Sequence, residues 1–413
     1  MKVLRIVLAV ASVIAATTVV GVSPANAQQF IMPDFGTDQG WQGDKHPRFV
    51  VDITGDGRAD VVGFGETGVH TAVATSNGQF QASFQVNHDF GFNTGWRVGQ
   101  HDRFVTDITG DGRADIVGVG DALVYTAVSS GGGQFGPITP ISTTGFTAST
   151  CAIRKMADAD GDGRSDLFCI KDQRVDVALA NGNGGFGQPV LATTVFPIFD
   201  FQGSTTDFTI VDVSGDRRAD ILGTITNSQG IFPQFLTLIS IGGGMYNAEE
   251  DGGGTWRSGG PVEPDQVADV SGDGLADLVY FNDMTYVARG RGDGTFASYV
   301  IASPDFGRNT RWRPFRESPF WHPRFVVDLN GDHRSDIIGF GSAQVVTAAG
   351  RSNGQFVDPV VPASTDFVRN RGWTDAVTFP RFVTDITGDG IPDIVGFGIA
   401  GLYTAVNRGG TFS

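Results

Sequence analysis

The chain has 413 residues, of which 59 are glycine, and its formal net charge at neutral pH is −16. Phosphate backbones and anionic lipid surfaces repel a chain this acidic, which argues against nucleic acid as a partner. Two cysteines are too few for a disulfide-rich scaffold.

The N-terminal segment has the pattern of a secretory signal peptide. Lys2 and Arg5 precede an apolar run over residues 6–22, and Ala25-Asn26-Ala27 follows as an A-x-A cleavage site. We expect cleavage after Ala27, which removes residues 1–27 and leaves 28–413 as a secreted protein. No later stretch offers about 18 consecutive apolar residues, so we expect no membrane insertion.

One nonapeptide occurs seven times: aspartate, any residue, a small polar residue, glycine, aspartate, three further residues and aspartate. The first aspartates of successive copies are separated by 51 to 59 residues. Seven near-equal units predict a closed ring of seven modules. The copies occupy residues 52–60, 107–115, 158–166, 212–220, 269–277, 328–336 and 385–393.

Strand patterns surround each nonapeptide. In the first copy, residues 48–52 enter the loop, 59–65 leave it and 69–73 follow a turn, all rich in β-branched side chains. A fourth short strand precedes the next Asp-Phe pair. Four strands per repeat with glycine turns predict the blade of a propeller. We therefore expect an all-β, seven-bladed β-propeller with four-stranded blades over residues 28–413.

The two ends predict how the ring closes. The last copy stops at Ser413 without the fourth strand that other copies have. The missing strand occurs at the start of the mature chain, where residues 29–35 end in Asp34-Phe35. We predict that this N-terminal strand completes the last blade and removes an exposed sheet edge.

The nonapeptide is typical of a calcium loop, because oxygens at positions 1, 3, 5, 7 and 9 can supply most of the ligands that Ca²⁺ takes. Position 3 is aspartate in the third copy, asparagine in the sixth and threonine or serine elsewhere. We predict structural Ca²⁺ in some loops; the alternative is that these residues are turn formers whose carboxylates bind nearby amides. The candidate ligands are Asp158, Asp160, Asp162 and Asp166; Asp328, Asn330, Asp332 and Asp336; Asp52, Asp56 and Asp60; Asp107, Asp111 and Asp115; and Asp385, Asp389 and Asp393.

Cys151 and Cys169 both lie in the third repeat. An exported protein can oxidise an even pair, so we expect a disulfide between them. A simple hairpin register does not place them opposite each other, and two small buried residues remain the alternative.

The loop at 52–60, with Val61-Val62-Gly63-Phe64-Gly65 after it, resembles the FG-GAP or VCBS repeats of integrin alpha-subunit propellers. The longer unit is similar to the repeat of the Psathyrella velutina lectin family, and the similarity covers essentially the whole mature chain. In the second copy this unit is Asp89-Phe90-Gly91, Gly95-Trp96-Arg97-Val98, His101, Arg103-Phe104 and residues 107–115. The resemblance implies a lectin that binds sugars, such as N-acetylglucosamine or sialylated glycans, in shallow pockets between blades.

The resemblance also implies sugar-binding residues, repeat by repeat. An aromatic ring binds the C–H face of a sugar, while Asp, His and Arg bind its polar atoms. The third, fourth and fifth copies lack the full set, so we expect about half of the sites to bind; the alternative is that the Trp and His-x-Arg residues pack the blades together. The candidates are Asp34, Trp41, His46 and Arg48; Asp89, Trp96, His101 and Arg103; Asp305, Trp312, His322 and Arg324; and Asp366, Trp373 and Arg381, where Phe379 replaces the histidine.

The sequence does not predict an enzyme. Its one Gly-x-Ser-x-Gly match, at 350–354, has no histidine after it, and we interpret it as a turn. The histidines lack zinc-site spacing, and no acid–base pair stands outside the repeated loops. We expect glycans or glycoconjugates as partners and leave the oligomeric state open, a monomer being compatible. A protein-binding adhesion propeller and a polysaccharide lyase or glycoside hydrolase are the alternatives, because fold alone does not separate them.

Overall fold

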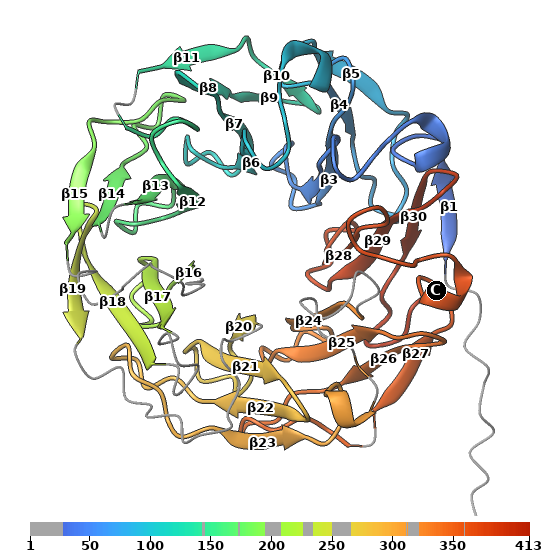
Figure 1. Cartoon of the computed structure of the whole chain (residues 1–413). Coiled ribbons are helices and arrows are strands. Elements are labelled where there is room, and N and C mark those ends of the chain that lie inside the picture. The colour runs from blue at the N-terminus through green and yellow to red at the C-terminus, as the bar shows by residue number, and fades with distance from the viewer. Residues whose placement is uncertain are drawn as a thin grey trace, which may run out of the picture.

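The computed structural model describes residues 28–142, 145–171, 174–194, 208–225, 234–249, 266–310, 312, 322–358 and 360–413. The predicted signal peptide, residues 1–27, lies outside these described residues. Seven four-stranded antiparallel sheets follow one another around a ring (Figure 1). This arrangement confirms the predicted all-β, seven-bladed propeller.

Blades 1 to 6 each take four strands in chain order, from the centre of the ring outward (Figure 1). Blade 2 also carries a short hairpin, formed by β9 and β10, between its third and fourth strands. The strands of blades 1 to 3 are β2 (Arg48–Val51), β3 (Asp60–Phe64), β4 (Val69–Ala72) and β5 (Phe84–Asn87); β6 (Arg103–Thr106), β7 (Asp115–Val119), β8 (Val124–Ala127), β9 (Ser129–Gly131), β10 (Gln134–Phe135) and β11 (Thr139–Ile141); and β12 (Ile153–Ala157), β13 (Asp166–Lys171), β14 (Arg174–Ala178) and β15 (Val190–Thr193).

The remaining blades follow the same plan, except that the last one takes its outer strand from the N-terminus. The strands of blades 4 to 7 are β16 (Phe208–Val211), β17 (Asp220–Ile225), β18 (Gln234–Gly242) and β19 (Met245–Glu249); β20 (Gln266–Ala268), β21 (Asp277–Phe281), β22 (Thr285–Ala288) and β23 (Val300–Ser303); β24 (Arg324–Val327), β25 (Asp336–Phe340), β26 (Val345–Ala348) and β27 (Val361–Ser364); and β28 (Arg381–Thr384), β29 (Asp393–Phe397), β30 (Leu402–Ala405) and β1 (Gln29–Met32).

Helical structure is minor in the described residues. Short 3₁₀ helices follow the outer strands of four blades, and none is long or apolar enough to span a bilayer. They are η1 (Thr37–Gln39), η2 (Phe92–Thr94), η4 (Arg308–Thr310) and η6 (Arg369–Arg371).

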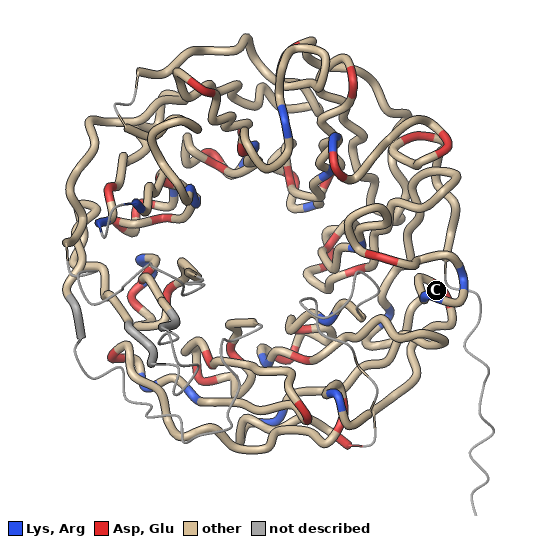
Figure 2. Tube along the Cα trace, viewed as in Figure 1, with Lys and Arg blue, Asp and Glu red and all other residues tan. Residues whose placement is uncertain are grey.

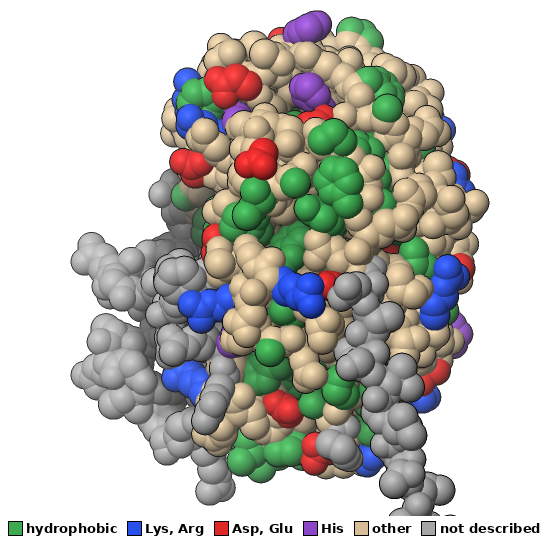
Figure 3. Space-filling view, turned by 90° about the vertical axis from the view of Figure 1, so that its right-hand side faces the viewer, with side chains coloured by type: hydrophobic (Ala, Val, Ile, Leu, Met, Phe, Trp, Pro, Cys, Tyr) green, Lys and Arg blue, Asp and Glu red, His purple; other side chains and the backbone are tan. Residues whose placement is uncertain are grey.

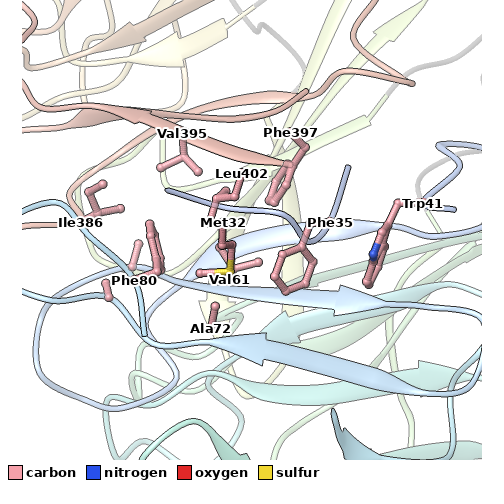
Figure 4. Packing of buried hydrophobic residues seen from close by; sticks show 12 residues of the cluster. Met32, Phe35, Trp41, Val61, Ala72, Phe80, Ile386, Val395, Phe397 and Leu402 are labelled. Carbon is pink, nitrogen blue, oxygen red and sulfur yellow. The ribbon is translucent and has the colours of Figure 1, made fainter. Parts of the chain in front are cut away.

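The N-terminal strand closes the ring, as predicted. β1 pairs antiparallel with β30, with Gln29 opposite Thr404. Beside this pair, Met32 and Phe35 pack with Val61 of blade 1 and with residues of blade 7 (Figure 4). Burying each large apolar side chain contributes about 1.5–3 kcal/mol. This cluster joins the two ends of the chain, and it therefore stabilises the closed ring itself.

The second strand of each blade is the most deeply buried. All five residues of β3, β7, β21, β25 and β29 are buried. Such a strand is covered on both faces by neighbouring blades, which explains its continuous apolar sequence without polar alternation.

The nonapeptide loops connect the first and second strands and face the centre of the ring (Figure 2). In the first loop, Asp52 accepts the backbone N–H groups of Gly55 and Gly57 at 2.7 Å. Neighbouring loops are also joined, since the Ala59 N–H donates to the Asp385 carbonyl at 2.8 Å. The same bond recurs between the second and first loops and between the third and second. The inner rim is therefore a nearly continuous chain of hydrogen bonds between blades.

The fourth strands form the outer wall of the disc. Figure 3 shows apolar side chains on this wall, interspersed with polar ones. Phe30, Ile301 and Val361 are each about half exposed there. An outermost strand has no further strand beside it, which accounts for these exposed side chains.

Candidate functional site

In four blades a sharp turn follows the outer strand at an Asp-Phe pair. The phenylalanine adopts a left-handed backbone conformation, with φ of 61° at Phe35, 60° at Phe90, 60° at Phe306 and 56° at Phe367. This conformation costs an ordinary residue about 1–2 kcal/mol. Each of the four rings is fully buried, which contributes a comparable or larger stabilisation. Burial of the phenylalanine ring therefore offsets the cost of the left-handed backbone and stabilises the turn.

The turn places a tryptophan against the next blade. After η1, Gly40 takes a left-handed φ of 87° and Trp41 follows it. The Trp41 ring lies over Gly63 of β3, where an added Cβ would stand 2.5 Å from the Cη2 atom of the indole. The same glycine–tryptophan contact recurs at Gly118, Gly339 and Gly396. The glycine in the second strand is therefore required by the ring that packs on it.

The arginine that recurs in these four units is buried and bonds to the turn rather than facing solvent. Arg48 is 6% exposed, and its Nη1 donates to the carbonyl oxygen of Phe35 at 2.8 Å. Arg103, Arg324 and Arg381 make the same bond, at 3.1, 2.6 and 3.0 Å, to the phenylalanines of their own turns. Burial lowers the pKa of Arg48 to about 10, which leaves it charged at neutral pH. These contacts match the packing alternative for the arginines.

In two of the units, the aspartate before the turn orients its surroundings. Asp34 Oδ1 accepts hydrogen bonds from Trp41 Nε1 at 2.9 Å and from the Phe35 N–H at 2.7 Å. Its other oxygen accepts from the hydroxyl of Ser83. Asp305 likewise accepts from Trp312 Nε1 at 3.0 Å. These bonds fix the tryptophan ring in place.

The histidine of the first unit has a defined tautomer. His46 Nδ1 accepts the Gln42 N–H at 3.1 Å, so Nε2 carries the proton and donates to Glu66 Oε2 at 3.1 Å. Burial lowers the pKa of His46, although Glu66 opposes that shift. The imidazole is therefore neutral at neutral pH.

The corresponding histidines meet different partners. His101 Nε2 lies 3.1 Å from Asp121 Oδ1, out of line for a hydrogen bond, and His322 Nε2 lies 3.0 Å from Ser342 Oγ. In the last unit Phe379 stands in the histidine's place.

A pocket of about 230 Å³ opens where the connection from blade 7 crosses onto blade 1. Three of the four residues predicted for this repeat line it, and Arg48 does not. Sequence reasoning missed Glu66 and His70, whose ring lies 5.6 Å from that of Trp41. Glu66 follows Gly65, the first residue after β3, and His70 alternates with buried Val69 along β4. The lining residues are Asp34, Gln39, Gly40, Trp41, His46, Gly65, Glu66, Thr67 and His70.

The rim of this pocket is not repeated around the ring. The position of Glu66 is Asp121 in blade 2, Ser342 in blade 6 and Ile399 in blade 7. The four tryptophan-bearing units therefore share a scaffold and differ in the polar groups that a ligand would meet.

The third repeat has a disulfide where four others have the tryptophan. Cys151 and Cys169 are bonded, with their Cα atoms 5.7 Å apart. Cys169 occupies in β13 the position that Gly63 occupies in β3. The Cys151 N–H donates to the Thr147 carbonyl at 3.0 Å, much as Trp41 bonds to Gly36 at 3.2 Å. A covalent bond thus replaces the tryptophan–glycine contact in this blade.

Five nonapeptide loops are satisfied by their own hydrogen-bond donors. The Thr54 hydroxyl donates to Asp52, and the Asn330 side-chain amide donates to Asp336 Oδ2 at 3.0 Å. Threonine or serine at position 3 donates in the second, fourth and seventh loops as well. In these loops the side chain at position 3, which would otherwise be a metal ligand, donates a hydrogen bond to a neighbouring carboxylate.

The third loop differs from these. Asp158, Asp160 and Asp166 bring carboxylate oxygens within 4.8 Å of one another, and Asp160 Oδ1 is buried without a hydrogen-bond partner. Burial raises the pKa of Asp160, and so does the charge of neighbouring Asp162. An unpartnered buried carboxylate oxygen beside two others fits the ligand preference of Ca²⁺. Asp162 itself pairs with Arg164.

Comparisons with known proteins agree with this geometry. The family model of the FG-GAP-like repeat matches residues 107–167 and 158–223. No curated protein sequence matches the chain. A lectin of Burkholderia pseudomallei, BP39L, is 15% identical, with 90% of this chain and 98% of that chain covered and a TM-score of 0.48, too distant for an inference.

A second solved structure is much more similar. It is a lectin of Agrocybe aegerita, described for its specific recognition of non-reducing terminal N-acetylglucosamine. The two chains are 30% identical, 84% of this chain and 88% of that chain are covered, and the TM-score is 0.72. On this identity over most of both chains, the present chain belongs to the same family as the Agrocybe aegerita lectin.

Proposed function

We propose that this chain is a lectin whose pocket on blade 1 holds a single sugar ring. The observation that carries the proposal is the convergence of Trp41 with Asp34, His46, Glu66 and His70 around one pocket of about 230 Å³. Pockets for drug-sized ligands occupy roughly 300–1,000 Å³, so this volume is suited to a smaller group such as one terminal sugar.

The chemistry of the lining residues supports the proposal. The part of Trp41 that reaches the pocket offers an apolar surface to sugar C–H groups. Glu66 is half exposed and accepts hydrogen bonds from hydroxyl or amide groups, while His46 holds it in place.

The ligand we propose is a terminal N-acetylglucosamine. Two carboxylates, Asp34 and Glu66, line the pocket, and its lining includes no lysine or arginine. A neutral sugar fits this charge, whereas the carboxylate of a sialylated glycan would be repelled. The sugar named for the Agrocybe aegerita lectin is also neutral N-acetylglucosamine.

Binding is better supported than catalysis. A glycosidase needs two carboxyl groups, one to act as acid and one as nucleophile or base. Both oxygens of Asp34 already accept hydrogen bonds, from Trp41, Phe35 and Ser83. Glu66 is then the one carboxylate of the pocket that has an oxygen available to a ligand.

Two further parts of the proposal concern export and metal. The A-x-A pattern ending at Ala27 supports secretion of the mature chain, residues 28–413. The unpartnered oxygen of Asp160 supports one structural Ca²⁺ ion in the third loop. Such an ion stiffens the connection between β12 and β13 and takes no part in sugar binding.

Calorimetric titration of residues 28–413 with N-acetylglucosamine tests the proposal. The variants Glu66→Ala and His70→Ala keep the buried Trp41 packing, so they should stay folded and lose the blade 1 site, which lowers the number of sugars bound. The matched control is Ser352→Ala, an exposed turn residue of blade 6 that should change nothing. Unchanged stoichiometry and affinity in both pocket variants would show that sugar does not bind there.

A further inference from the structure

The main-chain nitrogen of Gln28 donates a hydrogen bond to Asp366 Oδ2 at 3.0 Å. Asp366 is 3% exposed and lies in the turn after β27, so the contact joins blade 6 to the strand that completes blade 7. The other oxygen, Oδ1, is 3.8 Å from Nη1 of Arg371, whose side chain is about half exposed. Gln28 is also the residue that follows the expected signal-peptide cleavage site.

The contact at Gln28 has a counterpart one blade further round the ring. Asp34 stands at the corresponding turn after β1, and its Oδ2 accepts from the Ser83 hydroxyl. Ser83 precedes Asp89 by six residues, and Gln28 precedes Asp34 by six residues. The main-chain nitrogen of Gln28 therefore takes the position that a side-chain donor occupies in blade 1.

We propose that signal-peptide cleavage after Ala27 creates an α-ammonium group at Gln28 that forms an ion pair with Asp366. In the uncleaved chain this nitrogen is an amide with one hydrogen and no charge. Hydrolysis of the Ala27–Gln28 bond consumes one water and leaves a carboxylate on Ala27 and an α-ammonium group with three hydrogens at Gln28. Processing thereby strengthens the junction between blades 6 and 7 at the place where the ring closes.

The new positive charge at Gln28 should strengthen its contact with Asp366. An α-amino group has an ordinary pKa of about 7.7–8.0 and is charged at neutral pH. The bond from the Gln28 amide to a carboxylate is already charge-assisted, and cleavage adds the Coulomb attraction between two full charges to it. Asp366 is nearly inaccessible to solvent, so its charge is weakly screened there. The partly exposed Arg371 reaches only the other oxygen, which leaves Oδ2 to the new terminus.

The ion pair also determines the fate of the terminal glutamine. In an N-terminal glutamine, the α-amino nitrogen can attack its own side-chain Cδ and expel ammonia, which leaves an uncharged lactam. A protonated amine has no free electron pair for this attack. We therefore expect mature Gln28 to remain uncyclised.

The test compares two chains, one beginning at Gln28 and one that retains Ala27. The longer chain keeps the Gln28 N–H but moves the positive charge one residue away. We expect the chain beginning at Gln28 to have a Tm about 1–3 °C higher. Asp366→Asn should abolish this difference, and Asp305→Asn, the corresponding residue after β23, should leave it intact.

A measurement without substitutions completes the test. Between pH 7 and 10 the α-amino group loses its proton, so the difference in Tm between the two chains should disappear. Intact mass of the secreted protein should give a chain that begins at an uncyclised Gln28. Equal Tm values at pH 7, a difference that survives Asp366→Asn, or a cyclised or differently placed terminus would each overturn the proposal.

Discussion

Arg48 donates from Nη1 to the carbonyl oxygen of Phe35 at 2.8 Å, inside the boundary between blades 7 and 1. The left-handed turn at Phe35 directs this carbonyl into the protein, where Arg48 is its donor. The guanidinium group also lies 5.2 Å from the ring centre of Phe397 in β29. One buried cation thus holds both the turn and the neighbouring blade.

Replacing Arg48 with alanine should lower stability without removing a sugar contact. The Phe35 carbonyl would lose its partner, which costs about 1–3 kcal/mol. Urea denaturation at 25 °C measures the change in the free energy of unfolding. Arg351→Ala, at an exposed position, is the control and should have no effect. A stable Arg48→Ala protein that has lost sugar binding would instead make Arg48 a ligand contact.

The four tryptophan-bearing units should differ in their affinity for sugar because the residue at the position of Glu66 differs between them. Glu66→Ser gives blade 1 the rim residue of blade 6 and removes a charged acceptor, which should weaken that site by about tenfold or more. Ile399→Ser changes the same position in blade 7, where no histidine is present, and should have little effect. Calorimetry of the two variants checks this ranking, and equal losses in both would contradict it.

Calcium should bind once per chain, in the third loop. Asp160→Thr gives this loop the residue of the first loop and should abolish binding while the fold persists. At a calcium concentration of 100 times Kd, the bound ion should add about 2.7 kcal/mol to stability. Asp44→Asn is the matched control, because it removes an exposed carboxylate that lies outside all seven nonapeptide loops. Thermal unfolding measured with calcium and with chelator tests this prediction. Equal stabilisation of wild type and Asp160→Thr by calcium would show that the ion binds elsewhere.

The buried aspartates at position 9 should make the protein more stable at pH 5 than at pH 7.5. Burial raises the pKa of Asp60 and four counterparts to about 6 and that of Asp166 to about 7, from an ordinary value of 3.8. As the pH falls through this range, the folded chain binds protons before the unfolded chain does, and stability rises.

Two histidines oppose this trend. Burial lowers the pKa of His46 and His70 below 6.5, so the unfolded chain binds their protons first and stability falls as the pH decreases. The six buried carboxyl groups with raised pKa values should outweigh these two histidines. Thermal unfolding in chelator, which keeps Asp166 free of metal, checks the sign. A Tm that falls steadily from pH 7.5 to 5 would contradict it.

The disulfide should be a substantial stabiliser of blade 3. Cys151 and Cys169 are separated by 18 residues, and closing a loop of that size in the unfolded chain contributes about 3 kcal/mol. The double variant Cys151→Ala and Cys169→Ala should lose that amount in urea denaturation and should gain no further sensitivity to reductant. A double variant as stable as wild type would mean that packing alone holds this turn.

The fold was predictable because its signal is repeated. Seven aspartate loops at near-equal spacing, together with a leading strand that supplies what the last copy lacks, were enough to place β1 beside β30. Each copy repeats the same physical constraints, so the pattern can be recognised even where single residues vary between copies.

The site was only partly predictable, for reasons that lie in particular residues. The family resemblance implied Asp34, Trp41 and His46 but did not show that the Arg48 guanidinium faces a backbone carbonyl. Glu66 and His70 were missed because their counterparts in other blades differ, and a search for repetition overlooks such positions. Register could not place Cys151 opposite Cys169, since Cys151 lies in a turn outside the strands.

A glycan array with the mature chain, residues 28–413, is the most direct test of sugar binding. We predict binding to glycans that end in N-acetylglucosamine, weak or no binding to their sialylated forms, and loss of signal when Glu66→Ala is combined with the corresponding substitutions in blades 2 and 6. A blank array from folded protein, or binding confined to sialylated glycans, would contradict it.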